Sequence, residues 1–96
     1  MTSSIRLDYT NRALRDIRDI LQYTQERWGD EQEERYRQVL YKGFQNIRQH
    51  PDIGHEVSGR RTNIRELILE HHIIQYRREP ERVVILRIVG HRQRRR

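Results

Sequence analysis

The sequence has no cysteine, only two prolines, and a single lysine among its 20 cationic residues. Without cysteine, the chain can form neither a disulfide framework nor a thiolate metal site. No apolar run approaches the roughly 18 residues that a membrane-spanning helix needs, and the first residues lack the apolar segment of a secretory signal. We therefore expect a protein of the cytoplasm with no membrane contact and no cofactor.

Apolar and aromatic residues are also scarce. They make up 33% and 7% of the 96 residues, whereas apolar residues make up roughly 45–50% of average proteins. A chain of this length forms one domain, so we expect residues 1–96 to be a single domain with a thin core. A partner that covers apolar surface would stabilise such a domain by mass action.

The net charge of +6 is unevenly distributed along the chain. Residues 1–56 carry nine cationic and ten acidic residues, whereas residues 57–96 carry 11 arginines and four glutamates. Residues 57–96 therefore have a net charge of +7, which points to a polyanion or an acidic protein as their partner. A direct contact with nucleic acid is the secondary expectation.

Apolar residues that recur every three or four positions predict a first helix from about Ala13 to Trp28. Thr10 or Asn11 is placed to cap its start. Gly29 ends it, because glycine enters the left-handed conformation without a Cβ penalty.

A second helix follows directly. Asp30 is expected to cap it, with Glu33 completing a capping box. Pro51 ends it, because the residue before a proline is pushed away from helical geometry. The very short link at 29–30 makes the two helices an antiparallel hairpin. The apolar stripe of this helix comprises Tyr36, Val39, Leu40, Gly43, Phe44 and Ile47.

Four strands are predicted, over residues 5–9, 64–69, 72–77 and 83–89. Residues 83–86 are apolar on both faces, which is typical of an inner strand. Residues 51–62 are expected to be irregular. The predicted fold is α+β, in the order β-α-α-β-β-β: an N-terminal strand and an antiparallel α-hairpin packed on a small antiparallel β-sheet.

Four sequence motifs carry a resemblance to a known family. They are "ALRDIRDILQYTQERWGDEQEERY" (13–36), "HPDIG" (50–54), "IREL…HHIIQYR" (64–77) and "VVILRIVGHRQ" (83–93). In this order and spacing, covering nearly the whole chain, they resemble the ParE branch of the RelE/ParE toxin superfamily. The resemblance implies the toxin of a type II toxin–antitoxin pair, with the fold predicted above. It also implies a ParD-like antitoxin whose C-terminal segment wraps the toxin.

The activity that the resemblance implies depends on the branch. ParE-like members poison DNA gyrase by trapping its cleaved-DNA complex, without nuclease chemistry of their own. RelE-like members cut mRNA in the ribosome. Gly90–His91–Arg92 matches the beginning of a RelE-like ending, but residues 93–96 contain no tyrosine. We therefore expect a gyrase poison. A RelE-like mRNA endonuclease and a non-toxic regulatory remnant are the alternatives.

The candidate residues for binding the target or a polyanion are Arg60, Arg61, Arg65, Arg77, Arg87, His91 and Arg92. A nuclease would draw on Arg65, His91 and Arg92, because RNA cleavage needs a general acid, a general base and positive charge at the phosphate. If the chain is not a nuclease, two roles remain for His91: a plain surface or capping residue, or a contact with a partner.

Arg87 is expected on the same side of its strand as Val83, Ile85 and Val89, partly covered by its neighbours. Two roles are open for Arg87. It either forms a salt bridge to a helix carboxylate, or it belongs to a site that binds a phosphate or a partner.

The candidate residues for binding the antitoxin are Trp28, Tyr36, Leu40, Phe44, Arg65 and Arg77. The arginines suit an acidic antitoxin tail through bidentate carboxylate pairs. An antitoxin strand could also add to a sheet edge. The simplest interpretation of Trp28 is a packing anchor between the helices.

No metal site is expected. His71 and His72 are adjacent in the sequence, and adjacent strand residues point to opposite faces, so the two side chains cannot chelate one ion unless a turn reorients them.

Overall fold

The computed structural model describes residues 5–57 and 63–90. Each predicted helix and strand is present, and a short additional strand lies in the segment that we expected to be irregular. The elements are β1 (Arg6–Tyr9), α1 (Asn11–Trp28), α2 (Asp30–Gln49), β2 (His55–Glu56), β3 (Ile64–Ile68), β4 (His72–Arg78) and β5 (Arg82–Gly90). Within these ranges, neither helix is long and apolar enough to cross a membrane.

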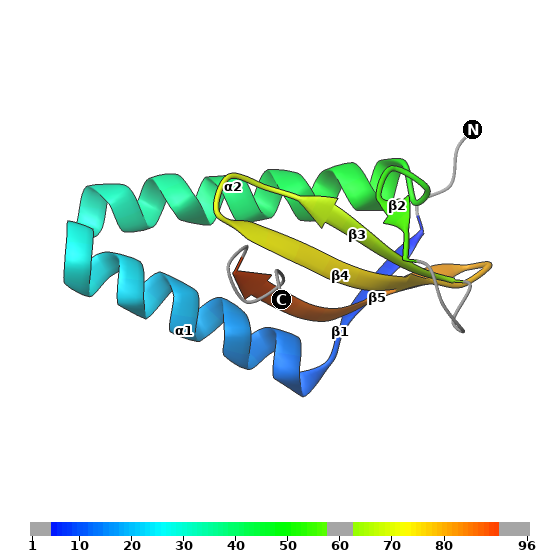
Figure 1. Ribbon diagram of the computed structural model, residues 1–96, viewed down its shortest axis with the longest axis horizontal. Coiled ribbons are helices and arrows are strands. Elements are labelled where there is room, and N and C mark those ends of the chain that lie inside the picture. The colour runs from blue at the N-terminus through cyan, green and yellow to red at the C-terminus, as the bar shows by residue number, and fades with distance from the viewer. Residues whose placement is uncertain (1–4, 58–62, 91–96) are drawn as a thin grey trace.

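The helices form an antiparallel hairpin that packs on a sheet with the strand order β1-β5-β4-β3-β2 (Figure 1). This confirms the α+β class and the inner position of β5. The sheet is mixed rather than wholly antiparallel, because β1 pairs parallel with β5, with Leu7 beside Val83. No hairpin turn sets the direction of β1, since the helices and three other strands separate it from β5 in the chain.

Thr10 begins α1 and also attaches it to the sheet. Its Oγ1 accepts a hydrogen bond from the backbone N–H of Ala13 at 3.0 Å and donates one to the carbonyl of Leu86 at 2.9 Å. The predicted cap is therefore confirmed, and it fixes the start of α1 against β5.

Gly29 joins the two helices with a φ of 97°, as the predicted glycine stop requires. The capping box predicted for α2 is wrong: Asp30 is already the first helical residue, and no side chain caps this helix. The carboxylate of Asp30 instead accepts a hydrogen bond from Gln25 at 3.0 Å. Because the link has a single residue, Asp30 has no position outside the helix from which to cap it.

The core lies between the hairpin and the sheet. It contains Ala13 and Leu21 of α1, four residues of α2, two of β4 and three of β5; those of α2 and the sheet are Tyr36, Leu40, Phe44, Ile47, Ile74, Tyr76, Val83, Ile85 and Ile88. Trp28 is not among them. It is 65% exposed, because the tip of the hairpin projects beyond the sheet (Figure 1). The prediction of a packing anchor is wrong.

A bulge interrupts the alternation of β5. Leu86 has no partner in the pairing of β4 with β5, so Ile85 and Ile88, three residues apart, both face the helices. Arg87 consequently lies on the opposite face of the sheet from Val83 and Ile85. The prediction that Arg87 shares a side of its strand with these residues is wrong. Because a bulge inserts one extra residue into the strand, each side chain after it points to the opposite face from the one that regular alternation would give.

Candidate functional site

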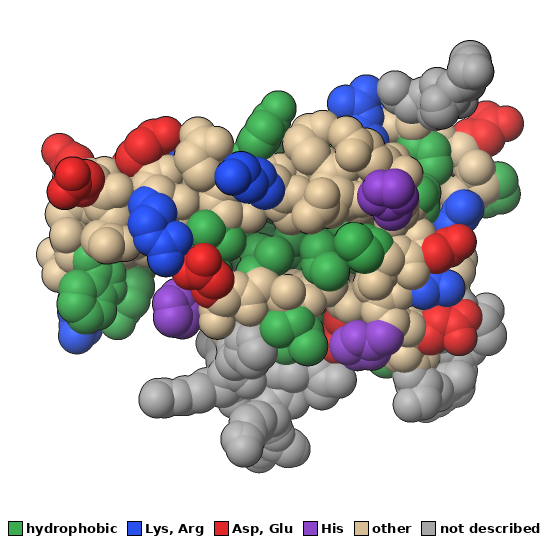
Figure 2. All heavy atoms as spheres, turned by 90° about the horizontal axis from the view of Figure 1, so that it is seen from above, with side chains coloured by type: hydrophobic (Ala, Val, Ile, Leu, Met, Phe, Trp, Pro, Cys, Tyr) green, Lys and Arg blue, Asp and Glu red, His purple; other side chains and the backbone are tan. Residues whose placement is uncertain are grey.

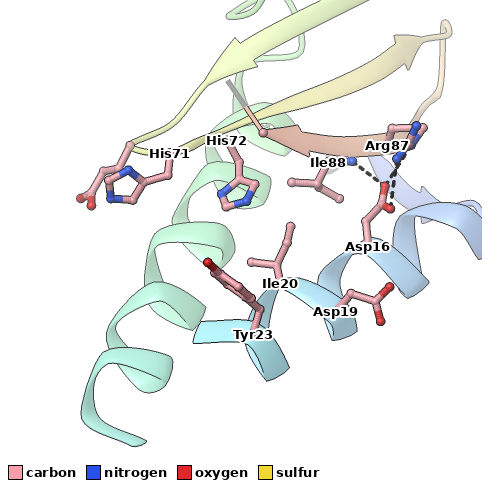
Figure 3. Close-up of a pocket in the computed structure, with 10 residues that line it drawn as sticks. Asp16, Asp19, Ile20, Tyr23, His71, His72, Arg87 and Ile88 are labelled. Atoms are coloured by element: carbon pink, nitrogen blue, oxygen red, sulfur yellow. Dashed lines mark hydrogen bonds and ion pairs between the residues drawn. The ribbon is translucent and has the colours of Figure 1, made fainter. Parts of the chain in front are cut away.

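A groove lies between α1, the start of α2 and the turn that joins β3 to β4. Its two adjoining parts have volumes of about 650 and 640 Å³, within the range of small-molecule pockets. Both parts are lined by Ile20, Tyr23, His71 and His72. Figure 3 shows Ile20 and Tyr23 on α1 facing His72 across the hollow.

Exposed aromatic side chains form one end of the groove, at the tip of the hairpin. Tyr23 and Trp28 are 55% and 65% exposed. The guanidinium of Arg27 lies 5.4 Å from the ring centroid of Tyr23 and 5.9 Å from that of Trp28. Figure 2 shows hydrophobic side chains gathered at this end of the molecule. Aromatic residues and arginine are the side chains that protein interfaces favour.

The β3–β4 turn is fixed to α2, which gives the groove a rigid wall. The hydroxyl of Tyr36 lies 2.8 Å from Nδ1 of His72, and the backbone N–H of His71 donates to the same hydroxyl at 3.4 Å. Arg35 and Glu70 form a salt bridge of 2.8 Å beside them. Burial raises the pKa of Tyr36, so its hydroxyl keeps its proton at neutral pH.

Asp16 forms the other end of the groove and ties α1 to β5 (Figure 3). Its carboxylate accepts hydrogen bonds from Nε of Arg87 at 3.1 Å and from the backbone N–H of Ile88 at 2.9 Å. Arg12 donates a further one at 3.4 Å. Burial acts to raise the pKa of Asp16, but the hydrogen bonds from Arg87 and Ile88 outweigh it, and the pKa is lowered. Of the alternatives for Arg87, the salt bridge to a helix carboxylate is the one observed.

Arg65 organises the loop that contains "HPDIG". Its guanidinium donates to the carbonyls of Asp52, at 3.1 Å, and Gly54. The hydroxyl of Tyr76 donates to the carbonyl of Pro51 at 2.7 Å and accepts from the N–H of Gly54 at 2.9 Å. A Cβ on Gly54 would lie 2.8 Å from the carbonyl oxygen of Glu66, so this position requires glycine. Arg65 therefore has a local structural role.

Arg77 belongs to a network at the β4–β5 turn. Glu79 accepts hydrogen bonds from Arg77 at 2.8 Å and from Arg82 at 2.7 Å. Arg82 also binds Asp8 on β1 at 2.9 Å. The hydrogen bonds from Arg82 and Arg77 lower the pKa of Glu79. Arg77 is thus already paired with a carboxylate.

The structure does not bring the described target candidates into one cluster. Arg65 shares the face of its partner Tyr76 in the core, and Arg77 lies on the opposite face of the sheet. Arg87 is at the edge beside α1. The other candidates, Arg60, Arg61, His91 and Arg92, lie outside the described residues.

The antitoxin candidates also divide. Leu40, Phe44 and Tyr36 are buried in the core, and Tyr36 also lines the groove. Their stripe faces the sheet rather than solvent. Trp28 is the antitoxin candidate whose side chain is exposed to solvent. Sequence reasoning missed Ile20 and His71 as groove residues, because their proximity arises only when the β3–β4 turn folds against the hairpin.

Sequence reasoning also missed Glu66, a carboxylate that is only 3% exposed. It accepts a hydrogen bond from Gln75 at 3.1 Å, and Nε2 of His55 lies 3.9 Å away. Within residues 5–57 and 63–90, no group of three or more His, Asp or Glu side chains is placed to hold a metal ion.

Comparison with known proteins places these features in a family. The family model described as "ParE toxin of type II toxin-antitoxin system, parDE" matches residues 7–95. Toxin ParE1 of Caulobacter vibrioides is 32% identical over 80 residues, which cover 83% of this chain and 82% of that protein.

Solved structures share the fold. The chromosomal ParDE system from P. aeruginosa superposes with a TM-score of 0.75 at 22% identity, over 90% of this chain and 95% of that one. The RelBE2 toxin–antitoxin complex from Mycobacterium tuberculosis gives 0.69 at 16% identity, over 92% and 99%. The DinJ–YafQ complex from E. coli gives 0.60 at 16%, over 96% and 98%. With the family match spanning the described fold, the chain belongs to the ParE toxin family of type II toxin–antitoxin systems.

Proposed function

We propose that this chain poisons DNA gyrase without nuclease chemistry of its own, and that a ParD-like antitoxin neutralises it. Membership of the ParE family and the similarity to Toxin ParE1 support this function. Because gyrase acts on DNA inside the cell, the proposal also assigns the toxin to the cytoplasm.

The pairing of the candidate arginines is the observation that carries the proposal. Arg65, Arg77 and Arg87 bind Asp52, Glu79 and Asp16 at 3.1, 2.8 and 3.1 Å. A nuclease needs cations free to stabilise charge on the scissile phosphate. Arginines that are already occupied by carbonyl or carboxylate oxygens supply this poorly. Within residues 5–57 and 63–90, which include only Arg65 of the three nuclease candidates, this pairing supports a toxin that acts through protein contacts.

Two features support an antitoxin partner. The aromatic end of the groove exposes Tyr23 and Trp28 to solvent. Residues 57–96 carry 11 arginines against four glutamates. An acidic partner with apolar side chains would cover the exposed rings, pair with arginines of this segment and stabilise the thin core of the toxin.

Two assays on the purified toxin test the proposal. The first follows the supercoiling of a relaxed plasmid by gyrase. The second follows the cleavage of an mRNA on programmed ribosomes. We expect supercoiling to be inhibited and the mRNA to remain intact, and the antitoxin to restore supercoiling.

The reverse result, with the mRNA cut and supercoiling unaffected, would show a RelE-like endonuclease and contradict the proposal. Inactivity in both assays together with tight antitoxin binding would leave the regulatory remnant as the function.

A further inference from the structure

We propose that the outer face of the helical hairpin, which points away from the sheet, pairs two copies of this chain around a two-fold axis beside Leu21. This inference does not depend on the proposed function. A second groove, of about 520 Å³, runs along the outer face between α1 and α2, and every described residue that lines it belongs to one of the two helices. Among the described residues, it shares no lining residue with the groove at the β3–β4 turn.

The α1 wall of this second groove carries apolar side chains. Leu14, Ile17 and Leu21 line it. Leu14 is 51% exposed and Ile17 is partly exposed, whereas Leu21 is buried between the helices. A second copy laid along the outer face would remove apolar surface of Leu14 from water, which favours association.

Charges of opposite sign are concentrated at the two ends of the outer face. Near the start of α1, Arg15 and Arg18 are exposed, and neither side chain has an ion pair or hydrogen bond with another described residue. The positions three and four residues from Arg18 hold no carboxylate, so its own helix does not neutralise it. At the tip of the hairpin, residues 26–34 carry five carboxylates and one arginine. Two of these carboxylates, Glu31 and Glu34, belong to exposed residues at the start of α2.

The spacing of these charges is self-complementary. Arg18 and Arg15 lie about 4.5 and 9 Å from Leu21 toward the start of α1, at 1.5 Å per residue. The link between the helices lies about 12 Å from Leu21 in the other direction, and α2 returns from it, so Glu34 and Glu31 lie about 4.5 and 9 Å beyond Leu21. In two antiparallel hairpins related by a two-fold axis beside Leu21, each arginine therefore meets a glutamate at the same height.

The two-fold symmetry forms every contact twice. Both arginine–glutamate pairs thus occur on each side of the axis. Glu34 already contacts Arg37 at 3.5 Å and accepts a hydrogen bond from Gln38 at 3.1 Å, but a carboxylate has about four acceptor sites and can bind a further arginine. Because exposed ion pairs are individually weak, we expect a dimer that depends strongly on salt.

Charge reversal tests this arrangement. One variant carries Arg15→Glu and Arg18→Glu, and the other carries Glu31→Arg and Glu34→Arg. Each variant alone places like charges at all four contacts, so each should be monomeric. An equimolar mixture should form the dimer again, because every contact in the mixed pair joins opposite charges. Arg6→Glu is the matched control, since it makes the same charge change on β1 at a side chain that is 68% exposed.

Sedimentation velocity measures the mass of each sample at roughly 100 µM toxin, where an interface with a Kd of about 10 µM is mostly dimeric. The unmodified toxin and Arg6→Glu should sediment with about twice the mass of one chain in about 0.1 M salt. Their mass should fall toward that of one chain in about 1 M salt, because the Debye length shortens from roughly 10 to 3 Å. All variants should keep the helical circular dichroism of the unmodified toxin.

A monomeric unmodified toxin in the low-salt buffer would overturn the proposal, as would reversal variants that remain dimeric. A mixture of the two folded variants that stays monomeric would contradict the pairing of the two ends. If one variant loses its helical signal, the variant with all four changes replaces it: both ends are then exchanged, so it should dimerise like the unmodified toxin, and a folded monomer would overturn the proposal. Assemblies that keep growing with concentration would show a head-to-tail contact and contradict the two-fold axis.

Discussion

Replacing Tyr76 by phenylalanine tests how the "HPDIG" loop is held. The change deletes a single oxygen from a side chain that is 0% exposed. That oxygen donates to the carbonyl of Pro51 at 2.7 Å and accepts from the N–H of Gly54 at 2.9 Å. Phenylalanine keeps the packing of the ring and removes both hydrogen bonds.

The two losses differ in size. The N–H of buried Gly54 would be left without an acceptor, which costs about 1–3 kcal/mol, and the net loss at Pro51 adds about 1 kcal/mol. We therefore expect the free energy of unfolding to fall by about 3 kcal/mol. For a domain of this size that corresponds to a fall in Tm of roughly 12–24 °C. Since natural domains have only about 5–15 kcal/mol of stability, this loss is a large share.

Urea unfolding followed by circular dichroism at 222 nm measures the change. Tyr41→Phe is the matched control, because the hydroxyl of the exposed Tyr41 has no hydrogen bond to the described residues, and the change should alter stability by less than about 0.5 kcal/mol. Indistinguishable midpoints for the two variants would refute the proposed anchoring of the loop.

Three further changes test other parts of the structure. Leu40→Ala should lower the free energy of unfolding by about 2–5 kcal/mol, whereas Trp28→Ala at the exposed tip should stay within about 0.5 kcal/mol; urea unfolding compares them. Gly54→Ala should cost about 1–3 kcal/mol through overpacking, because its Cβ would meet the carbonyl oxygen of Glu66 at 2.8 Å, and a neutral result would contradict the close approach. Asp16→Asn should destabilise at pH 7. Because the folded-state pKa of Asp16 is lowered, its stabilisation is present above about pH 4 and is lost as the pH falls through that pKa. Unfolding between pH 7 and pH 2 should show the gap to the unmodified protein closing in acid, and a constant gap would contradict the ionic role.

The helices and strands could be predicted because their signals are local. Spacings of three and four residues define the stripes of both helices, and Gly29 with its φ of 97° ends the first as expected. Features that depend on distant residues could not be predicted. The parallel direction of β1 and the two-residue strand β2 depend on neighbours remote in the sequence, and the bulge at Leu86 arises where β5 passes from β1 to the open edge.

The candidate site was predicted less well, for the same reason. The sequence identifies Arg65 and Arg87 as cations in strands but not their partners, Asp52 and Asp16, which come from a loop and a helix far away in the chain. Periodicity also placed Trp28 on the buried stripe of α1, although the hairpin extends past the sheet at that point. Charge and composition thus indicated an acidic partner, whereas the groove between α1 and the β3–β4 turn became visible only in three dimensions.

Trapping of cleaved DNA tests the central claim most directly. Supercoiled plasmid is incubated with the toxin, with gyrase, or with both, then treated with detergent and protease, and the linear DNA is measured on a gel. We predict linear DNA only when toxin and gyrase are present together, because a gyrase poison stabilises breaks that gyrase makes. Linear DNA with the toxin alone, or none with both proteins, would contradict a non-enzymatic gyrase poison.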